Sequence, residues 1–252
     1  MFAQLVGFFW FTIALFPLTF LQRVLHREIQ AALLILTRDA TLTMGIFSLI
    51  FLPGVFLHEL SHFLTAKILR VPTGRFSIFP KPLPDGRLQL GYVETARSDI
   101  VRDSLIGAAP LIVGTFIVAY VAIDRLDMRI LWDTLRHGQL NLFWIGLSNL
   151  SRVNDFYLWL YLVFAVSSTM TPSESDRRAW LNLTVVVGAL LAIIWMVGAG
   201  PWFVNRIASA VSAFLSSTAV IFGLSAVIHA ILIAPVALIH KLLARIAGVD
   251  VR

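Results

Sequence analysis

Long apolar runs, separated by short polar stretches, dominate the chain. Six runs have the length and character of transmembrane helices: residues 4–21, 42–69, 104–122, 156–170, 180–197 and 216–239. A helix needs roughly 20 consecutive apolar residues to cross a bilayer core about 30 Å thick. The pattern therefore predicts an all-α polytopic membrane protein with about six transmembrane helices, which form a single transmembrane domain over residues 1–252.

Residues 71–98 have a different pattern. Polar and apolar residues alternate over 75–79 and again over 87–93, and Pro84-Asp85-Gly86 between them is a turn signal. Alternation with a period of two on both sides of a turn predicts a β-hairpin, here between spans two and three. Two further segments, 29–37 and 124–155, suit helices at the membrane surface, being too short or too charged to span.

Composition and charge agree with a membrane protein. Of the 252 residues, 58% are apolar and only 13% are charged, whereas soluble domains carry about a quarter charged residues. The net charge of +6 comes from basic residues in the loops, and seven of these lie within 67–102. Because Lys and Arg favour the cytoplasmic side, we expect a multi-pass protein of a prokaryotic cell (inner) membrane with both termini cytoplasmic. Nucleic acid is not an expected partner, and the absence of cysteine excludes disulfides, thiolate metal sites and cysteine nucleophiles.

A polar cluster, His58-Glu59-Leu60-Ser61-His62, interrupts the second apolar run. Histidines four residues apart share one face of a helix, where two imidazoles can bind one Zn²⁺. Glu59 is offset around the helix and can take a proton from water beside the metal. Ionisable groups inside a span are costly and usually mark function. The alternative is that Glu59 is a buried carboxylate bonded to a neighbouring helix.

A catalytic zinc site needs a third protein ligand. Asp176 is the preferred candidate, because Pro172 would end the preceding helix and let the chain turn back toward the histidines. Glu174 and Asp155 are rival ligands. Asp176 could instead be a solvated loop carboxylate or the N-cap of the following helix.

The sequence around these residues resembles the site-2 protease family of intramembrane zinc metalloproteases. The resemblance rests on His58-Glu59-Leu60-Ser61-His62-Phe63 and on Ala66, Lys67, Arg70 and Val71, which follow it. It also rests on Gly91-Tyr92-Val93 in the hairpin and on Gly107-Ala108-Ala109-Pro110-Leu111, which is similar to the family's Ala-Gly-Pro element. Asp176, which comes after a proline, resembles the family's Asp ligand. It covers residues 45–120 well and 165–178 loosely. It implies a zinc protease with His58, His62 and Asp176 as ligands and Glu59 as the catalytic base.

The chain departs from the family at positions that bear on catalysis. In the family's third-ligand motif an Asn stands three residues before the proline and a Gly follows the Asp, whereas this chain has Thr169 and Arg177. The family also has an Asn where this chain has Val113. Such asparagines can donate hydrogen bonds to an oxyanion, and loss of one donor typically lowers the rate by about 10²–10³. The hydroxyls of Ser167, Ser168 or Thr169 are candidate replacements.

Three functions follow as hypotheses. The first is an intramembrane zinc metalloprotease whose metal-site core covers about residues 42–178 and whose partners are a substrate helix and the lipid bilayer. The second is a catalytically inactive, site-2-protease-like structural or assembly subunit of a larger membrane complex, with other membrane subunits as partners. The third, an ion transporter, is disfavoured because the sequence has no repeated halves. His229 and His240 are expected to hydrogen-bond neighbouring carbonyls rather than to bind metal.

Overall fold

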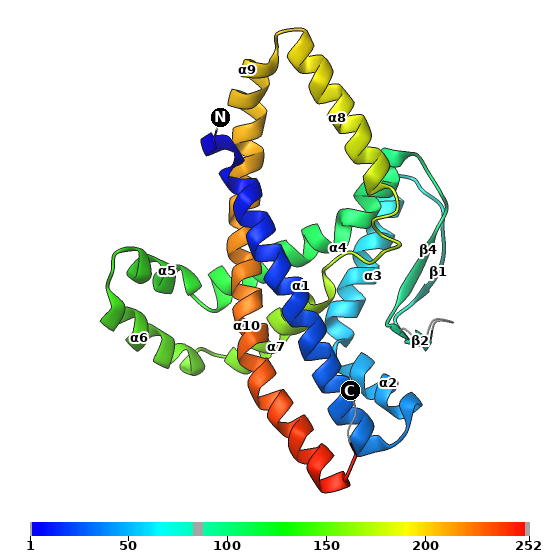
Figure 1. Ribbon diagram of the computed structural model, residues 1–252, viewed down its shortest axis with the longest axis vertical. Coiled ribbons are helices and arrows are strands. Elements are labelled where there is room, and N and C mark those ends of the chain that lie inside the picture. Colours follow the sequence, from blue (N-terminus) through cyan, green and yellow to red (C-terminus); the bar gives the residue numbers. More distant parts are fainter. Residues whose placement is uncertain (1, 83–87, 250–252) are drawn as a thin grey trace.

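Two long helices form the axis of the protein, and shorter helices and a small hairpin lie to either side (Figure 1). The computed structural model describes residues 2–82 and 88–249. Its helices are α1 (Phe2–Thr37), α2 (Ala40–Ile50), α3 (Leu52–Ile68), α4 (Ile100–Tyr120), α5 (Met128–Arg136), α6 (Leu140–Asn149), α7 (Phe156–Thr169), α8 (Trp180–Met196), α9 (Gly200–Phe203) and α10 (Ser209–Ala247). Helices α1 and α10 pack side by side along most of their length (Figure 1).

Several helices are long and apolar enough to cross a membrane. Within the described residues there are three: Val6–Thr37, Ile100–Arg125 and Ser209–Ala247. The pair α2 and α3 makes a fourth if the two are counted as one broken span. Helices α7 and α8 are apolar but shorter, with 14 and 17 residues. The chain is therefore a helical membrane protein.

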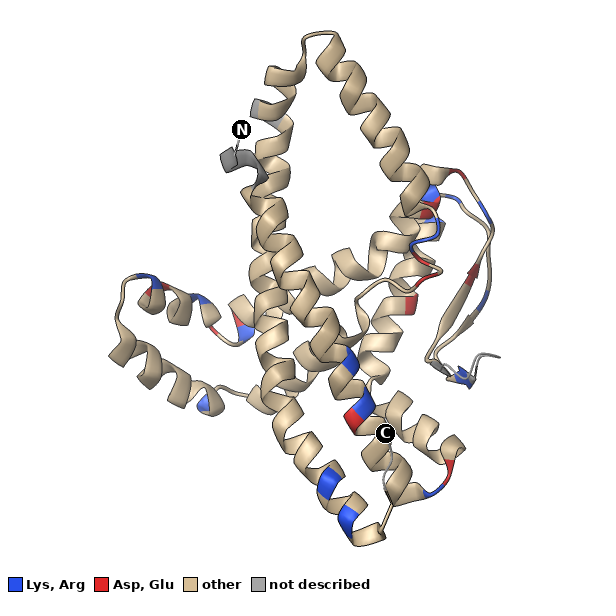
Figure 2. Ribbon diagram, in the orientation of Figure 1, with Lys and Arg blue, Asp and Glu red and all other residues tan. Residues whose placement is uncertain are grey.

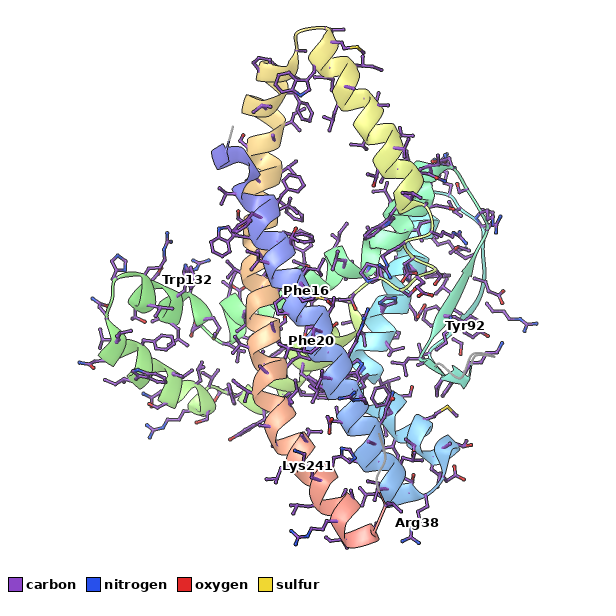
Figure 3. All side chains as sticks on the ribbon, in the orientation of Figure 1. Phe16, Phe20, Arg38, Tyr92, Trp132 and Lys241 are labelled. Carbon is purple, nitrogen blue, oxygen red and sulfur yellow. The ribbon has the colours of Figure 1, made fainter. Side chains whose placement is uncertain are left out.

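Exposed apolar side chains and charged residues are distributed as expected for a helical membrane protein. Phe16 and Phe20 on α1 are 75% and 59% exposed (Figure 3), as expected for side chains that contact lipid. Figure 2 shows long uncharged stretches of α1, α8 and α10, while Lys and Arg gather toward the C-terminal halves of α1 and α10 and near the hairpin.

Two expectations about the first two spans are wrong. Residues 29–37 do not form a separate surface helix, because α1 continues without a break to Thr37. The expected helix over 42–69 is broken at Phe51, where α2 and α3 meet at an angle of 73°. Pro53 explains the break, because proline lacks the backbone N–H and its ring clashes with the preceding turn. The Tyr161 hydroxyl donates a 2.9 Å hydrogen bond to the carbonyl of Ile50 at this break.

The predicted β-hairpin is confirmed. Strand β1 (Thr73–Ser77) pairs antiparallel with β4 (Tyr92–Thr95), with Phe76 opposite Val93. Beyond them β2 (Lys81–Pro82) pairs with β3 (Leu88–Gln89). The expected turn at Pro84-Asp85-Gly86 lies outside the described residues. Residues 128–149 fold into the helices α5 and α6, which project from the bundle (Figure 1), and their interfacial role stays a prediction.

Close packing brings α3 against α7, and this contact determines where the histidines lie. A Cβ atom built on Gly54 of α3 would lie 2.1 Å from the carbonyl oxygen of Ala165 on α7. Only glycine allows the two backbones to approach so closely, as small residues do in membrane helix pairs. His58 comes one turn after Gly54 and therefore faces the C-terminal end of α7.

Candidate metal centre

His58 and His62 place their imidazole rings side by side on α3. The ring centroids are 4.8 Å apart, and the two Nε2 atoms are 3.1 Å apart. Two nitrogens bound to one tetrahedral zinc at about 2.0 Å would be about 3.3 Å apart. The pair therefore already has the spacing that a shared ion requires.

The opposite nitrogen of each ring is hydrogen-bonded to a backbone carbonyl. The Nδ1 atom of His58 donates to the carbonyl of Thr169 at 2.6 Å, and that of His62 donates to the carbonyl of Ile106 at 2.8 Å. A carbonyl oxygen can only accept, so each Nδ1 carries the proton. In the neutral form of each ring, Nε2 then carries a lone pair directed into the space that the two rings share, which is the usual arrangement of histidine ligands.

Two prolines make these carbonyls available. The N–H of residue 110 would normally bond the carbonyl of Ile106 within α4, but Pro110 has none. Thr169 is the last residue of α7, where carbonyls lack partners in the helix, and Pro172 follows shortly after. Each histidine is therefore oriented by a backbone carbonyl that has no partner within its helix, Thr169 of α7 for His58 and Ile106 of α4 for His62.

Asp176 brings a carboxylate to the same place from the segment between α7 and α8. Its Oδ1 lies 3.2 Å from Nε2 of His62, and its Oδ2 lies 3.7 Å from Nε2 of His58. Burial alone would raise the pKa of the Asp176 carboxyl, but the two neighbouring imidazoles, when protonated, outweigh this effect and hold that pKa well below its usual range. The group is thus a carboxylate, the form that binds metal.

The loop that carries Asp176 is fixed against α4. The Oδ2 atom of Asp176 accepts the backbone N–H of Ser173 at 2.7 Å, and Arg178 forms a 3.2 Å ion pair with Asp103 of α4. A Cβ atom built on Gly107 would lie 1.9 Å from the carbonyl oxygen of Asp176. The glycine of the Gly-Ala-Ala-Pro element thus makes room for this loop.

The donor atoms of His58, His62 and Asp176 all lie within 4.8 Å of one another, the one such cluster of three or more potential ligands in the part of the chain that the structure describes. Two imidazole nitrogens and one carboxylate are a donor set of the kind that holds catalytic zinc with a coordination position left for water. The residues present therefore fit the ion that the sequence predicts.

The rival ligands are placed differently. Asp155 precedes the N-terminal end of α7, whereas the histidines face its C-terminal end, 14 residues later. Glu174 lines the same cavity, but its carboxylate is not part of the cluster of donor atoms.

Glu59 lies beside this cluster and is 7% exposed. It lines a cavity of about 780 Å³ together with His58, His62 and Asp176, and strand β4 forms another wall, with Tyr92 visible on the hairpin in Figure 3. A Cβ atom built on Gly91 would lie 2.8 Å from Cγ of Glu59, so the hairpin rests directly on this side chain. Among the described residues none hydrogen-bonds the Glu59 carboxyl, so it does not serve as a tie to another helix.

The candidate oxyanion donors are engaged elsewhere. The hydroxyls of Ser167 and Thr169 donate to carbonyls one turn earlier in α7. The hydroxyl of Ser168 pairs with Nε2 of His229 at 2.8 Å. His229 bonds the Ser225 carbonyl as expected, but His240 contacts the Glu28 carboxylate at 2.7 Å rather than a carbonyl.

Sequence reasoning missed the carbonyls of Ile106 and Thr169 as partners of the histidines. Pro110 was the available signal for Ile106, because a proline inside a helix frees the carbonyl four residues earlier. No local signal indicates which carbonyl His58 contacts, since Thr169 is 111 residues away.

Comparisons with protein-family models, with curated proteins and with solved structures give no match to this chain.

Replacing Pro110 with Ala should weaken zinc binding. The new N–H would reach the Ile106 carbonyl within α4 and compete with the Nδ1–H of His62, while the helix itself gains stability. Loss of a hydrogen bond behind a metal ligand typically lowers affinity by about 10–100-fold. A zinc titration against a competing chelator measures this, with Pro235→Ala in α10 as the control. Equal zinc affinity in wild type and Pro110→Ala would contradict the account.

Replacing Gly107 with Ala should displace the loop that carries Asp176. The added methyl group would overlap a backbone carbonyl, which cannot move without shifting the whole loop. Overpacking of this kind typically costs about 1–3 kcal/mol. We expect a lower thermal unfolding temperature and weaker zinc binding, measured on the same preparation. The control is Gly223→Ala, since a Cβ there meets nothing within 4 Å; an equal effect of both substitutions would argue against a special role for Gly107.

Proposed function

We propose that this protein is an intramembrane zinc metalloprotease that hydrolyses a peptide bond in or near a transmembrane helix of a membrane-protein substrate. The observation that carries the proposal is the convergence of His58, His62 and Asp176 on the wall of a cavity that also contains Glu59. A ligand set and a separate carboxylate beside it are what metal-assisted hydrolysis requires.

The roles of the residues follow from their positions. When bound, zinc would supply a Lewis acid that polarises the scissile carbonyl and makes water more acidic. His58, His62 and Asp176 would hold the ion, and the Thr169 and Ile106 carbonyls would orient the two rings. Glu59 would accept the proton of the attacking water and pass it to the leaving amine, because its carboxylate lines the cavity and makes no other bond within the described chain.

The substrate would have to present an extended backbone. A transmembrane helix has all its backbone groups hydrogen-bonded, so a segment of it must unwind before cleavage. Strand β4 lines the cavity and pairs with β1 along one edge, so an unwound segment could add to its other edge. The alternative role of the hairpin is to cover the site at the membrane surface.

The membrane arrangement that we propose has about six apolar segments and places the two termini on opposite sides of a prokaryotic cell membrane. Helices α1 and α10 run parallel, because Gly7 contacts Ser212 near their starts and Glu28 contacts His240 toward their ends. The expectation of two cytoplasmic termini does not fit this geometry. The long apolar helices, the broken pair α2–α3 and the shorter apolar helices α7 and α8 supply the six segments. Labelling of single cysteines introduced at Gly198, in the loop before α9, and at Gly248, directly after α10, would test this arrangement, because the two positions must be accessible from opposite sides of the membrane.

The activity can be tested with the purified full chain in liposomes. We expect zinc-loaded protein to cleave single-span membrane proteins within or next to the apolar segment, and a chelator to stop the cleavage, with fragments identified by mass spectrometry. Cleavage that persists without metal, or none across a broad set of single-span substrates, would count against the proposal.

A second candidate function is that of a non-proteolytic subunit. It is favoured by one observation: the hydroxyls of Ser167, Ser168 and Thr169 are all engaged, and Val113 stands where the family has a donor. Purification as a stoichiometric member of a membrane complex, without turnover of any helix, would support this function.

A further inference from the structure

The last turn of α7 is tied to three different helices by three consecutive residues. The carbonyl of Ser167 accepts a hydrogen bond from Nε2 of Gln22 on α1. The hydroxyl of Ser168 bonds His229 on α10, and the carbonyl of Thr169 accepts from His58 on α3. The residue that orients a candidate metal ligand is therefore itself held in place by α1 and α10.

The bond between Ser168 and His229 has a defined direction. The Nδ1 atom of His229 lies 2.7 Å from the carbonyl of Ser225, so it carries the single proton of a neutral imidazole. Its Nε2 atom must then accept, and the Ser168 hydroxyl donates to it at 2.8 Å. Both side chains are buried, and His229 is 0% exposed, so breaking this bond would leave an unpaired polar group inside the protein.

Gln22 forms the second tie. Its side chain is 4% exposed and donates through Nε2 to the Ser167 carbonyl, while its Oε1 accepts from the Thr171 hydroxyl at 3.4 Å. Ser167 is at the end of α7, where the carbonyls have no partners in the helix. Gln22 thus replaces the missing helical bonds and joins the end of α7 to the segment that leads to Asp176.

We propose that Gln22 and His229 are positioning residues of the metal centre. They hold the Thr169 carbonyl where it orients the ring of His58, although neither side chain belongs to the donor cluster. The inference rests on the proposed metal site and adds two residues, on α1 and α10, to it. It assigns a role to buried polar groups that the hydrolytic reaction itself does not use.

The expected effect is on metal affinity. Removing the acceptor at position 229 frees the Ser168 hydroxyl and lets the end of α7 shift, so the Thr169 carbonyl no longer fixes His58. We expect His229→Phe and Gln22→Leu each to weaken zinc binding by about 10–100-fold, as for other outer partners of metal ligands. Ser168→Ala, a smaller change, should weaken binding in the same direction.

The experiment uses the full chain in detergent and zinc as the probe, with affinity measured by chelator competition. His229→Gln serves as the rescue variant, because its amide oxygen can accept from Ser168. Ser217→Ala on α10 and Thr19→Val on α1 are controls, since each removes a hydroxyl bonded only within its own helix. The visible spectrum of the Co²⁺-loaded protein adds a readout of ligand geometry that loss of packing alone would not change.

The outcomes separate the two proposals. Weakened zinc binding and an altered Co²⁺ spectrum in His229→Phe, restored in His229→Gln and unchanged in both controls, would support the positioning role. Wild-type affinity and spectrum in His229→Phe, Ser168→Ala and Gln22→Leu would overturn it and leave the metal site intact. A wild-type chain that binds no zinc would overturn the metal site and the positioning role together.

Discussion

Replacing Glu59 with Gln is expected to abolish proteolysis while zinc remains bound. The amide cannot accept the proton of the attacking water, and loss of a general base typically lowers the rate by about 10²–10⁴-fold. Zinc should stay because the donor cluster consists of His58, His62 and Asp176. The change is nearly isosteric, so the hairpin that rests on this side chain through Gly91 should keep its place.

The measurement is the cleavage rate of a reconstituted substrate, with zinc content determined on the same sample. Asp133→Asn on α5, which removes a carboxylate from a helix that does not line the cavity, is the matched control and should cleave at the wild-type rate. Wild-type cleavage by Glu59→Gln would show that another group is the base. Loss of zinc in that variant would instead place Glu59 among the ligands.

Replacing Asp176 with Ala is expected to release the metal. It removes one of three protein ligands, so the loss of affinity should exceed the roughly 10–100-fold caused by loss of an outer hydrogen bond. Glu174→Ala is the informative control, since Glu174 lines the same cavity without joining the donor cluster. Zinc retained in Asp176→Ala and lost in Glu174→Ala would show that Glu174, not Asp176, is the third ligand.

The part of the site that the sequence predicts is the part set by local geometry. A spacing of four residues places His58 and His62 on one face of a helix wherever that helix lies. The alternation of polar and apolar residues on both sides of a turn signal likewise predicts the hairpin, because this pattern depends only on residues close together in the sequence. The proximity of Asp176 to the histidines was also predicted, because the ligand count of zinc calls for a third residue and Pro172 allows the chain to turn back.

The rest depends on contacts between distant segments. Gln22 bonds Ser167 across 145 positions, and His229 bonds Ser168 across 61, so no local pattern specifies either contact. The break at Phe51 could have been read from Pro53, but the apolar run continues through it, and hydrophobicity alone does not reveal a bend. The uninterrupted course of α1 to Thr37 was missed because Arg23, Arg27 and Glu28 interrupt the apolar pattern without interrupting the helix.

X-ray absorption at the zinc edge, on purified wild-type protein beside His58→Ala, tests most directly whether His58, His62 and Asp176 share one ion. We predict about one zinc per wild-type chain, with two imidazole nitrogens and oxygen donors at about 2.0–2.2 Å, and loss of this signal in His58→Ala. Zinc-free wild-type protein, or a zinc environment without imidazole that is the same in both samples, would contradict the account.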